Sequence, residues 1–131
     1  MATVTTAALA ELSGLAGNTG SKTAFTYLAV GTGTTAESAA HTQLVTEVTG
    51  SGLARASATV TQATTTHTND TLQLVKAWTV SGTVTISEVM MGNNATANTG
   101  TMAFRELLSP TKSVVSGDTY NLTAKLVFVD A

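Results

Sequence analysis

The chain has 131 residues, of which 43% are hydrophobic and only 11% are charged, and its net charge at pH 7 is −2. It contains no cysteine, which excludes disulfides, thiol nucleophiles and cysteine-ligated zinc. Its six lysine and arginine residues are too few to form the basic surface that binds nucleic acid. High hydrophobicity with low charge indicates a folded chain rather than a disordered one, and the length suits one domain.

The N-terminal segment has no basic stretch followed by an apolar run, so we expect no signal peptide. No stretch reaches the roughly 20 apolar residues of a membrane-spanning helix, so we expect no membrane insertion. Threonine makes up about a fifth of the chain. Threonine is β-branched and favours strands, and its hydroxyl groups, more than charges, would supply the polar surface.

The N-terminal residues 1–20 are predicted to form a short helix or an arm. Residues 6–16 have helical spacing, with Thr6 as a possible cap and Gly17 as a possible end. Two interpretations stay open: the helix packs on its own domain, or the arm docks on a neighbouring subunit. The candidate arm contacts are leucines spaced three apart: Leu9, Leu12 and Leu15.

Short runs of alternating apolar and polar residues fill the remainder, residues 21–131. Period two is typical of strands, and the lack of long helical segments between the runs favours antiparallel sheets. We therefore predict an all-β domain, an antiparallel β-sandwich of jelly-roll type. The predicted strands are 24–30, 53–62, 71–80, 83–91, 101–108 and 119–129, with 44–48 ambiguous. The predicted core side chains are Trp78, Ile86, Phe104, Tyr120, Leu122, Leu126 and Phe128.

Strands 72–80 and 84–90 are separated by only three residues, which predicts a hairpin. A three-residue loop aligns the two apolar faces and places Lys76 opposite Glu88. Both charges interrupt an apolar face, and an unpaired buried charge is costly. We expect either an ion pair across this hairpin or exposure of both groups at the open end of the sheet.

Arg55 and Arg105 lie in predicted strands of a chain that has few charges. A guanidinium group forms its strongest pairs with carboxylates, through two parallel hydrogen bonds. We therefore expect both arginines to be paired with carboxylates, and solvated surface arginines are the alternative.

Signals for catalysis, cofactors and metals are weak. Residues 31–36 match GxGxxA, but no helix follows and there is no βαβ unit, so a glycine-rich turn is expected. His41 and His67 belong to no metal-binding spacing, and the acidic residues are scattered. No P-loop or GxSxG sequence occurs. We predict no enzyme activity, no catalytic residue, no cofactor and no metal.

The order of the motifs resembles a family of bacteriophage virion proteins that includes small capsid decoration (cement) proteins and tail-fibre-like proteins. The similarity spans nearly the whole chain from about residue 9. One departure from the family pattern is Met90-Met91-Gly92, where small aliphatic residues and a phenylalanine are usual. The motifs that carry the resemblance are Phe25–Thr35, Thr42–Leu44, Glu47-Val48, Leu53–Arg55, Asn69–Thr71, Trp78–Gly82, Val84–Val89, Gly100–Arg105 and Ser116–Leu122.

This resemblance implies a jelly-roll sandwich in which Glu47, Arg55, Glu88 and Arg105 are the structurally important charges. It implies a non-enzymatic protein of the virion, made in the host cytoplasm, that binds the major capsid protein on the outer capsid surface and stabilises the shell. We expect it to act as a homo-oligomer, with a trimer as the first expectation. The alternatives are a tail, baseplate or fibre-base adaptor protein and a carbohydrate-binding attachment module, which the low aromatic content opposes.

Overall fold

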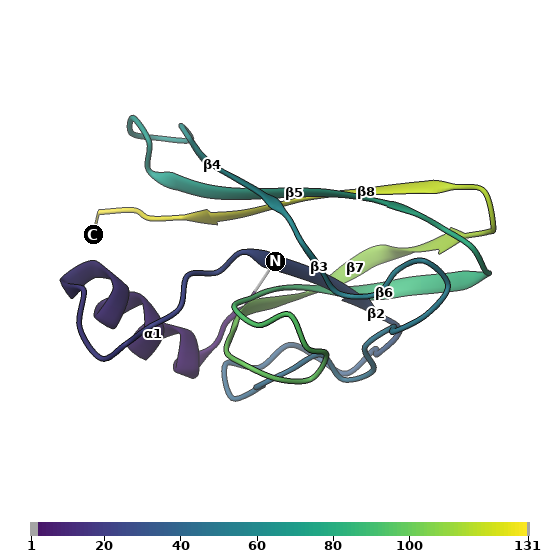
Figure 1. The fold of residues 1–131 in the computed structure, drawn as a ribbon, viewed down its shortest axis with the longest axis horizontal. Coiled ribbons are helices and arrows are strands. Elements are labelled where there is room, and N and C mark those ends of the chain that lie inside the picture. Colours follow the sequence, from purple (N-terminus) through teal and green to yellow (C-terminus); the bar gives the residue numbers. More distant parts are fainter. Residues whose placement is uncertain (1–2, 131) are drawn as a thin grey trace.

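The computed structural model describes residues 3–130 and shows two antiparallel sheets packed face to face, with a helix at one end (Figure 1). The elements are β1 (Thr3–Val4), α1 (Thr6–Gly17), β2 (Tyr27–Gly31), β3 (Ala56–Ser57), β4 (Thr59–Ala63), β5 (Thr71–Thr79), β6 (Val84–Gly92), β7 (Met102–Val114) and β8 (Thr119–Val127). The prediction of an all-β sandwich with a short N-terminal helix is confirmed.

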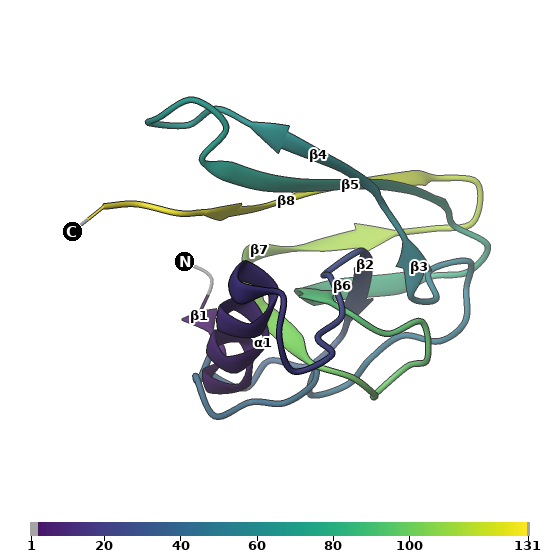
Figure 2. The same cartoon turned by 60° about the vertical axis from the view of Figure 1, so that its left-hand side comes forward.

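Sheet A has the strand order β1-β7-β6-β2-β3, and sheet B has the order β4-β5-β8. Every described strand pair is antiparallel. The chain passes from one sheet to the other between β3 and β4, between β5 and β6, and between β7 and β8 (Figure 2). The main chain therefore connects the two sheets at three places.

The predicted hairpin between strands 72–80 and 84–90 is wrong, because β5 lies in sheet B and β6 in sheet A. Lys76 lies opposite Leu122 of β8, far in register from Glu88, and the predicted Lys76–Glu88 pair does not form. An apolar stripe on each of two strands can be buried in one sheet or across two facing sheets. The alternating pattern of apolar residues is compatible with either arrangement. In the structure, the short connection at residues 81–83 joins the two sheets instead of closing a hairpin.

Three other segments differ from the predicted strands. The predicted strand 53–62 is split at Ala58, whose N–H donates to the Thr26 carbonyl at 2.9 Å, so β3 and β4 belong to different sheets. The segment 44–48 forms only an isolated bridge, between Gly31 and Glu47. β7 runs past the predicted end at residue 108, through Ser109-Pro110, and the extra residues form a bulge opposite β6.

The core lies between the two sheets and includes Trp78, whose ring is 6.1 Å from that of Tyr120 and whose Nε1–H donates to the Ala54 carbonyl. Of the predicted core residues, Trp78, Ile86, Phe104 and Leu126 are buried, and Tyr120 and Leu122 are half-buried against them.

Phe128 is not a core residue, because its side chain is 51% exposed. β8 ends at Val127, and the C-terminal segment then runs out past the strands of sheet A (Figure 1). The alternating pattern therefore continues for one step beyond the region where a second layer covers it.

The helix α1 packs on its own domain. Thr5, rather than Thr6, caps it by accepting from the Ala8 N–H at 3.1 Å, and Asn18 ends it with a φ of 49°. Ala8 is buried, and Leu12 and Leu15 pack against the core because spacings of three and four place them on the same helix face. Leu12 and Leu15 are therefore not free arm contacts, whereas Leu9 is 60% exposed.

β1 pairs with β7, so the predicted arm is joined to the sandwich by backbone hydrogen bonds as well as by the helix. Residues 1–2 of the predicted arm and residue 131 of the predicted domain lie outside the described residues.

Candidate functional site

Sheet A has a second covered face, on the side away from sheet B. The segment 32–48 lies over it and forms a separate small core of Ala29, Leu44, Met90 and Met102. As a result, β6 is buried on both faces from Ile86 to Gly92. The two buried ion pairs of the described chain lie on this second face.

Glu88 and Arg105 form an ion pair inside this second core. The Arg105 Nε–H donates to Glu88 Oε2 at 2.6 Å, and the two side chains are at most 1% exposed. Glu88 also accepts from the N–H groups of Thr46 (2.8 Å) and Val45 (3.2 Å), so its carboxylate fixes the covering segment to the sheet. The Nη atoms of Arg105 find no acceptor among residues 3–130.

The glycine turn after β2 makes room for this carboxylate. A Cβ on Gly31 would overlap Glu88 Oε1, and a Cβ on Gly33 would lie 2.9 Å from both Glu88 oxygens. The Ser87 hydroxyl also donates to the Gly33 carbonyl at 3.0 Å. The GxGxxA match is thus explained by close packing around a buried carboxylate.

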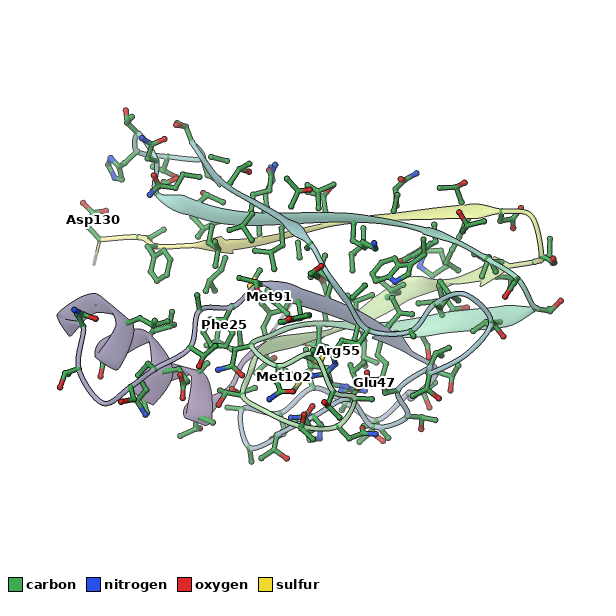
Figure 3. All side chains as sticks on the ribbon, viewed as in Figure 1. Phe25, Glu47, Arg55, Met91, Met102 and Asp130 are labelled. Carbon is green, nitrogen blue, oxygen red and sulfur yellow. The ribbon has the colours of Figure 1, made fainter. Side chains whose placement is uncertain are left out.

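Arg55 and Glu47 form the second buried pair, which Figure 3 labels below sheet A. The contact is bidentate, with Nε to Oε2 at 3.1 Å and Nη2 to Oε1 at 2.6 Å, and both side chains are at most 1% exposed. Arg55 Nη1 also donates to the carbonyls of Asn94 (3.2 Å) and Thr99 (3.1 Å). This guanidinium group therefore ties the glycine- and asparagine-rich loop 92–100 to the covering segment.

The structure thus shows both arginines paired with carboxylates, as the sequence predicts. Of the five predicted structural charges, Glu47, Arg55, Glu88 and Arg105 lie in these two pairs. The fifth, Lys76, is half-buried on the inner face of sheet B without an ion pair among the described residues.

Sequence reasoning missed two further carboxylates that hold the backbone. Glu37 accepts from the Leu107 N–H at 2.7 Å and the Thr3 hydroxyl at 2.8 Å. Burial acts to raise the pKa of Glu37, but these hydrogen bonds outweigh it and hold the pKa below its usual value. No local motif announces this contact, because it joins residues 70 positions apart.

Asp70 is the second, and it organises the turn between β4 and β5. It accepts from the N–H groups of Thr65, Thr66 and His67 at 2.7–2.8 Å. The His67 N–H foremost holds the pKa of Asp70 well below its ordinary value, against a smaller opposing effect of partial desolvation. The threonine- and asparagine-rich sequence before Asp70 is a turn signal that could have indicated this role.

The buried or half-buried carboxylates of Glu37, Glu47, Glu88 and Asp70 all carry structural contacts. Both buried carboxylates are occupied by guanidinium or N–H donors. Within residues 3–130, no group of three His, Asp or Glu side chains is placed to hold a metal ion. His67 is exposed, with Nε2 3.4 Å from Asp130, and His41 lies apart in the covering segment.

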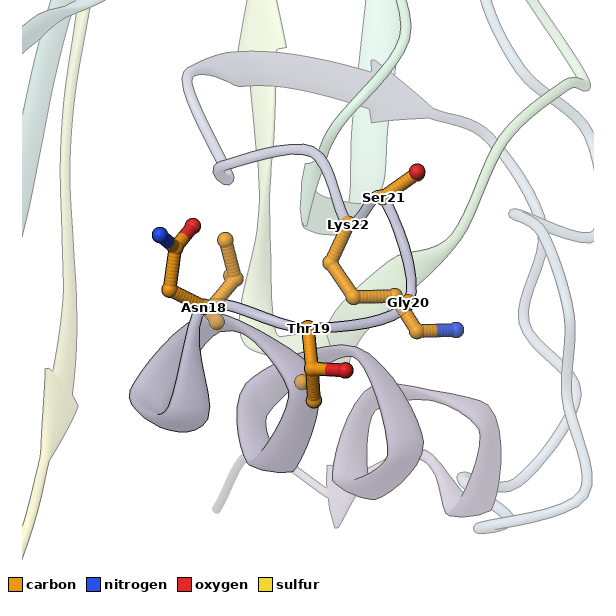
Figure 4. A pocket seen from close by; sticks show the side chains of 7 residues that line it. Asn18, Thr19, Gly20, Ser21 and Lys22 are labelled. Carbon is orange, nitrogen blue, oxygen red and sulfur yellow. The ribbon is translucent and has the colours of Figure 1, made fainter.

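A shallow hollow of about 380 Å³ lies beside the C-terminal end of α1 (Figure 4). It is lined by Gly14, Leu15 and residues 18–22, and its charged group is Lys22, whose Nζ is 3.7 Å from Glu11 Oε1. Its walls are mostly turn residues, and they bring together no nucleophile, acid or base pair.

The outer face of sheet B is formed by β4, β5 and β8, and no other element of the described chain packs on it as a sheet. Paired residues share a face, and Leu74 and Trp78 point into the core, so the alternate positions point outward. Of these thirteen positions, six are threonine and one, Lys125, is charged. They are Thr59, Thr61, Ala63, Thr71, Gln73, Val75, Ala77, Thr79, Thr119, Asn121, Thr123, Lys125 and Val127. Of these, Thr71 is buried, with its hydroxyl in contact with Thr65 and Asp70.

No family model, curated protein or solved structure matches the chain. Among residues 3–130, no helix has the length and apolar character needed to cross a membrane.

Proposed function

We propose that the protein is a non-enzymatic virion protein that binds the outer surface of a phage capsid as a homo-oligomer and stabilises the shell. The observation that carries the proposal is the outer face of sheet B, a surface rich in threonine with a single charge. The resemblance of the motif order to phage decoration proteins supports it. The major capsid protein is the proposed partner.

The proposed mechanism is the burial of many weak, uncharged contacts. Apolar area contributes about 25 cal/mol per Å² when it is removed from water, and the methyl groups of Thr, Val and Ala on this face supply such area. An oligomer that bridges several capsid subunits multiplies the effect. Because the protein binds the assembled lattice and not its separated subunits, it shifts the equilibrium toward the intact shell.

The test uses capsids of the phage that encodes the chain. Purified protein should co-sediment with mature capsids and raise the temperature at which they disrupt. Ala77→Glu places a charge at the centre of the outer face, and we expect it to abolish both effects. Ala36→Glu makes the same change on the covering segment at the far side of sheet A, and we expect it to bind like the unchanged protein.

Failure of the unchanged protein to bind any capsid form would refute the proposal. Equal loss of capsid binding in the Ala77→Glu and Ala36→Glu variants would show that the outer face of sheet B is not the binding surface. Copy number per virion separates the tail or baseplate alternative, because a shell protein is present in many more copies. The carbohydrate alternative is disfavoured by Trp78, whose indole is buried and therefore does not offer a stacking surface for a sugar.

A further inference from the structure

β8 has a strand neighbour on one edge only, because it is the last strand of sheet B. The bonds from the Val80 N–H to the Asp118 carbonyl (2.8 Å) and from the Phe128 N–H to the Asp70 carbonyl (2.9 Å) show which positions face β5. Hydrogen-bonded positions alternate along an antiparallel pair, so even-numbered residues of β8 bond β5. The odd-numbered residues therefore direct their N–H and C=O groups away from the sheet.

These outward groups belong to Thr119, Asn121, Thr123, Lys125 and Val127, which are all exposed. Their backbone groups have no hydrogen-bond partner among residues 3–130. A row of unpaired backbone donors and acceptors is a template for another strand.

The other edge strands are shorter, and the part of β7 that extends beyond β1 is interrupted by Pro110 and by a register shift. β1 and β3 have two residues each and β4 has five, whereas β8 has nine. Proteins protect long edges with proline, bulges or several charges. β8 contains no proline, pairs with β5 without a register shift, and carries one charge, Lys125.

We propose that a second copy of this chain pairs with this edge, β8 against β8 in antiparallel orientation. The full nine-residue overlap places the two-fold axis at Thr123, so that Thr123 faces its own copy. Lys125 then lies opposite Asn121 of the second copy, and Thr119 lies opposite Val127, so no like charges meet. An axis at Lys125 would instead oppose two lysines and shorten the overlap.

The inner face of the strand agrees with this register. Tyr120 lies opposite Leu126 of the second copy, and Leu122 lies opposite Ala124, so apolar side chains meet apolar ones. Tyr120 and Leu122 are half-buried in the single chain, and pairing covers them further. The result is a continuous six-stranded sheet with order β4-β5-β8-β8-β5-β4.

This inference does not rest on capsid binding. It favours a two-fold dimer over the trimer expected from the sequence. The dimer also doubles the width of the threonine-rich outer face, which would give a lattice-binding protein two equivalent contact surfaces.

The test exploits the self-facing position. In Thr123→Lys and in Thr123→Glu, like charges meet at the axis, and we expect the dissociation constant of the dimer to rise at least about tenfold in sedimentation equilibrium. Mixing the two variants places lysine opposite glutamate and should restore the dimer as a heterodimer. Thr61→Lys, on the same face but in β4, is the matched control and should dimerise like the unchanged protein.

Hydrogen exchange gives a second readout that needs no variant. The amides of Asn121, Thr123 and Lys125 should exchange slowly at high protein concentration and rapidly after dilution. The proposal is overturned if the unchanged chain is a monomer at every concentration reached or a trimer. It is also overturned if both Thr123 variants dimerise normally, or if their mixture does not recover the dimer while circular dichroism shows both to be folded.

Discussion

At the scale of single residues, the structure depends on a small number of buried charges. A chain with six basic and eight acidic residues places two arginine–glutamate pairs at positions that are at most 1% exposed. Burying ions is costly unless they are paired, so removing one partner is expected to destabilise more than removing an exposed charge. These charges hold backbone segments together, because Glu88 also accepts from main-chain N–H groups and Arg55 also donates to main-chain carbonyls.

Glu88→Gln should lower the free energy of unfolding by about 3–5 kcal/mol, because Arg105 would be left as an uncompensated buried charge. Urea denaturation measures the loss. Glu106→Gln, at a half-buried position of β7 without an ion pair among the described residues, should cost about 1 kcal/mol or less. Equal losses in the two variants would contradict the role assigned to the Glu88–Arg105 pair.

Gly31→Ala tests the close approach at the turn after β2. The added methyl would overlap both the Glu88 carboxylate and the Thr46 carbonyl, and we expect a loss of about 1–3 kcal/mol in thermal or urea unfolding. Gly50→Ala is the matched control, because its Cβ would meet nothing within 4 Å. A tolerated Gly31→Ala would show that the carboxylate moves away from the turn without cost.

At the scale of elements, what matters is where a strand leaves the two-layer region. β8 alternates from Tyr120 to Phe128, but the layer opposite it covers the pattern only as far as Leu126. The β4–β5 turn also lies outside the two-layer region, because it projects from the sandwich (Figure 1). Hydrogen bonds to Asp70, rather than apolar burial, hold this turn.

Phe128→Ala should therefore cost about 1 kcal/mol or less, since half of the side chain is already in water. Phe104→Ala, at a 3% exposed position between the sheets, should cost about 3–5 kcal/mol. Urea unfolding of the two variants makes the comparison. A large loss for Phe128→Ala would mean that another surface covers this end of sheet B.

Asp70 gives a pH prediction for the β4–β5 turn. The N–H donors lower the pKa of Asp70 in the folded protein. The carboxylate therefore stabilises the fold at pH values above its pKa in the unfolded chain, and this stabilisation is lost as the pH falls toward its pKa in the folded protein. Asp70→Asn should therefore be less stable than the unchanged protein at pH 7, because the amide NH₂ would face N–H donors. The difference should shrink below the ordinary value of 3.8. Thermal unfolding of both proteins between pH 7 and pH 2 measures the difference in stability. A difference that stays constant over this range would contradict the prediction.

At the scale of the whole molecule, the two faces of the protein differ in chemistry. The side of sheet A away from sheet B is covered by the segment 32–48 and holds the ion pairs, whereas the outer face of sheet B is open and nearly uncharged. An uncharged contact surface is insensitive to ionic screening.

Capsid binding through this face is expected to persist when salt is raised from about 0.1 M to 1 M, although the Debye length falls from about 10 Å to 3 Å. Co-sedimentation over this range is the measurement. Polylysine, which binds by charge alone, serves as the control and should be released. Loss of the protein at high salt would point to an ionic contact elsewhere on the molecule.

Local sequence patterns were sufficient to predict the class of fold and much of the core. Period-two alternation places Leu74, Trp78 and Leu126 on buried faces because side chains of a strand alternate whatever the strand pairs with. The scarcity of charge also predicted that Arg55 and Arg105 would be paired, because an unpaired buried guanidinium is too costly. The helix over residues 6–16 followed from its helical spacing and was correct to within one residue at each end, although Thr5 and Asn18 rather than Thr6 and Gly17 cap it.

Which strands are neighbours, and which carboxylate each arginine binds, could not be predicted from local patterns and is seen in the folded chain. Lys76 and Glu88 lie in different sheets. The sequence could not predict this, because a three-residue connection can either close a hairpin within one sheet or pass from one sheet to the other. Glu88 meets Arg105 and the Thr46 N–H through contacts between segments distant in sequence. The alternation gives the face of each side chain, whereas the strand neighbours depend on how two layers close over one core.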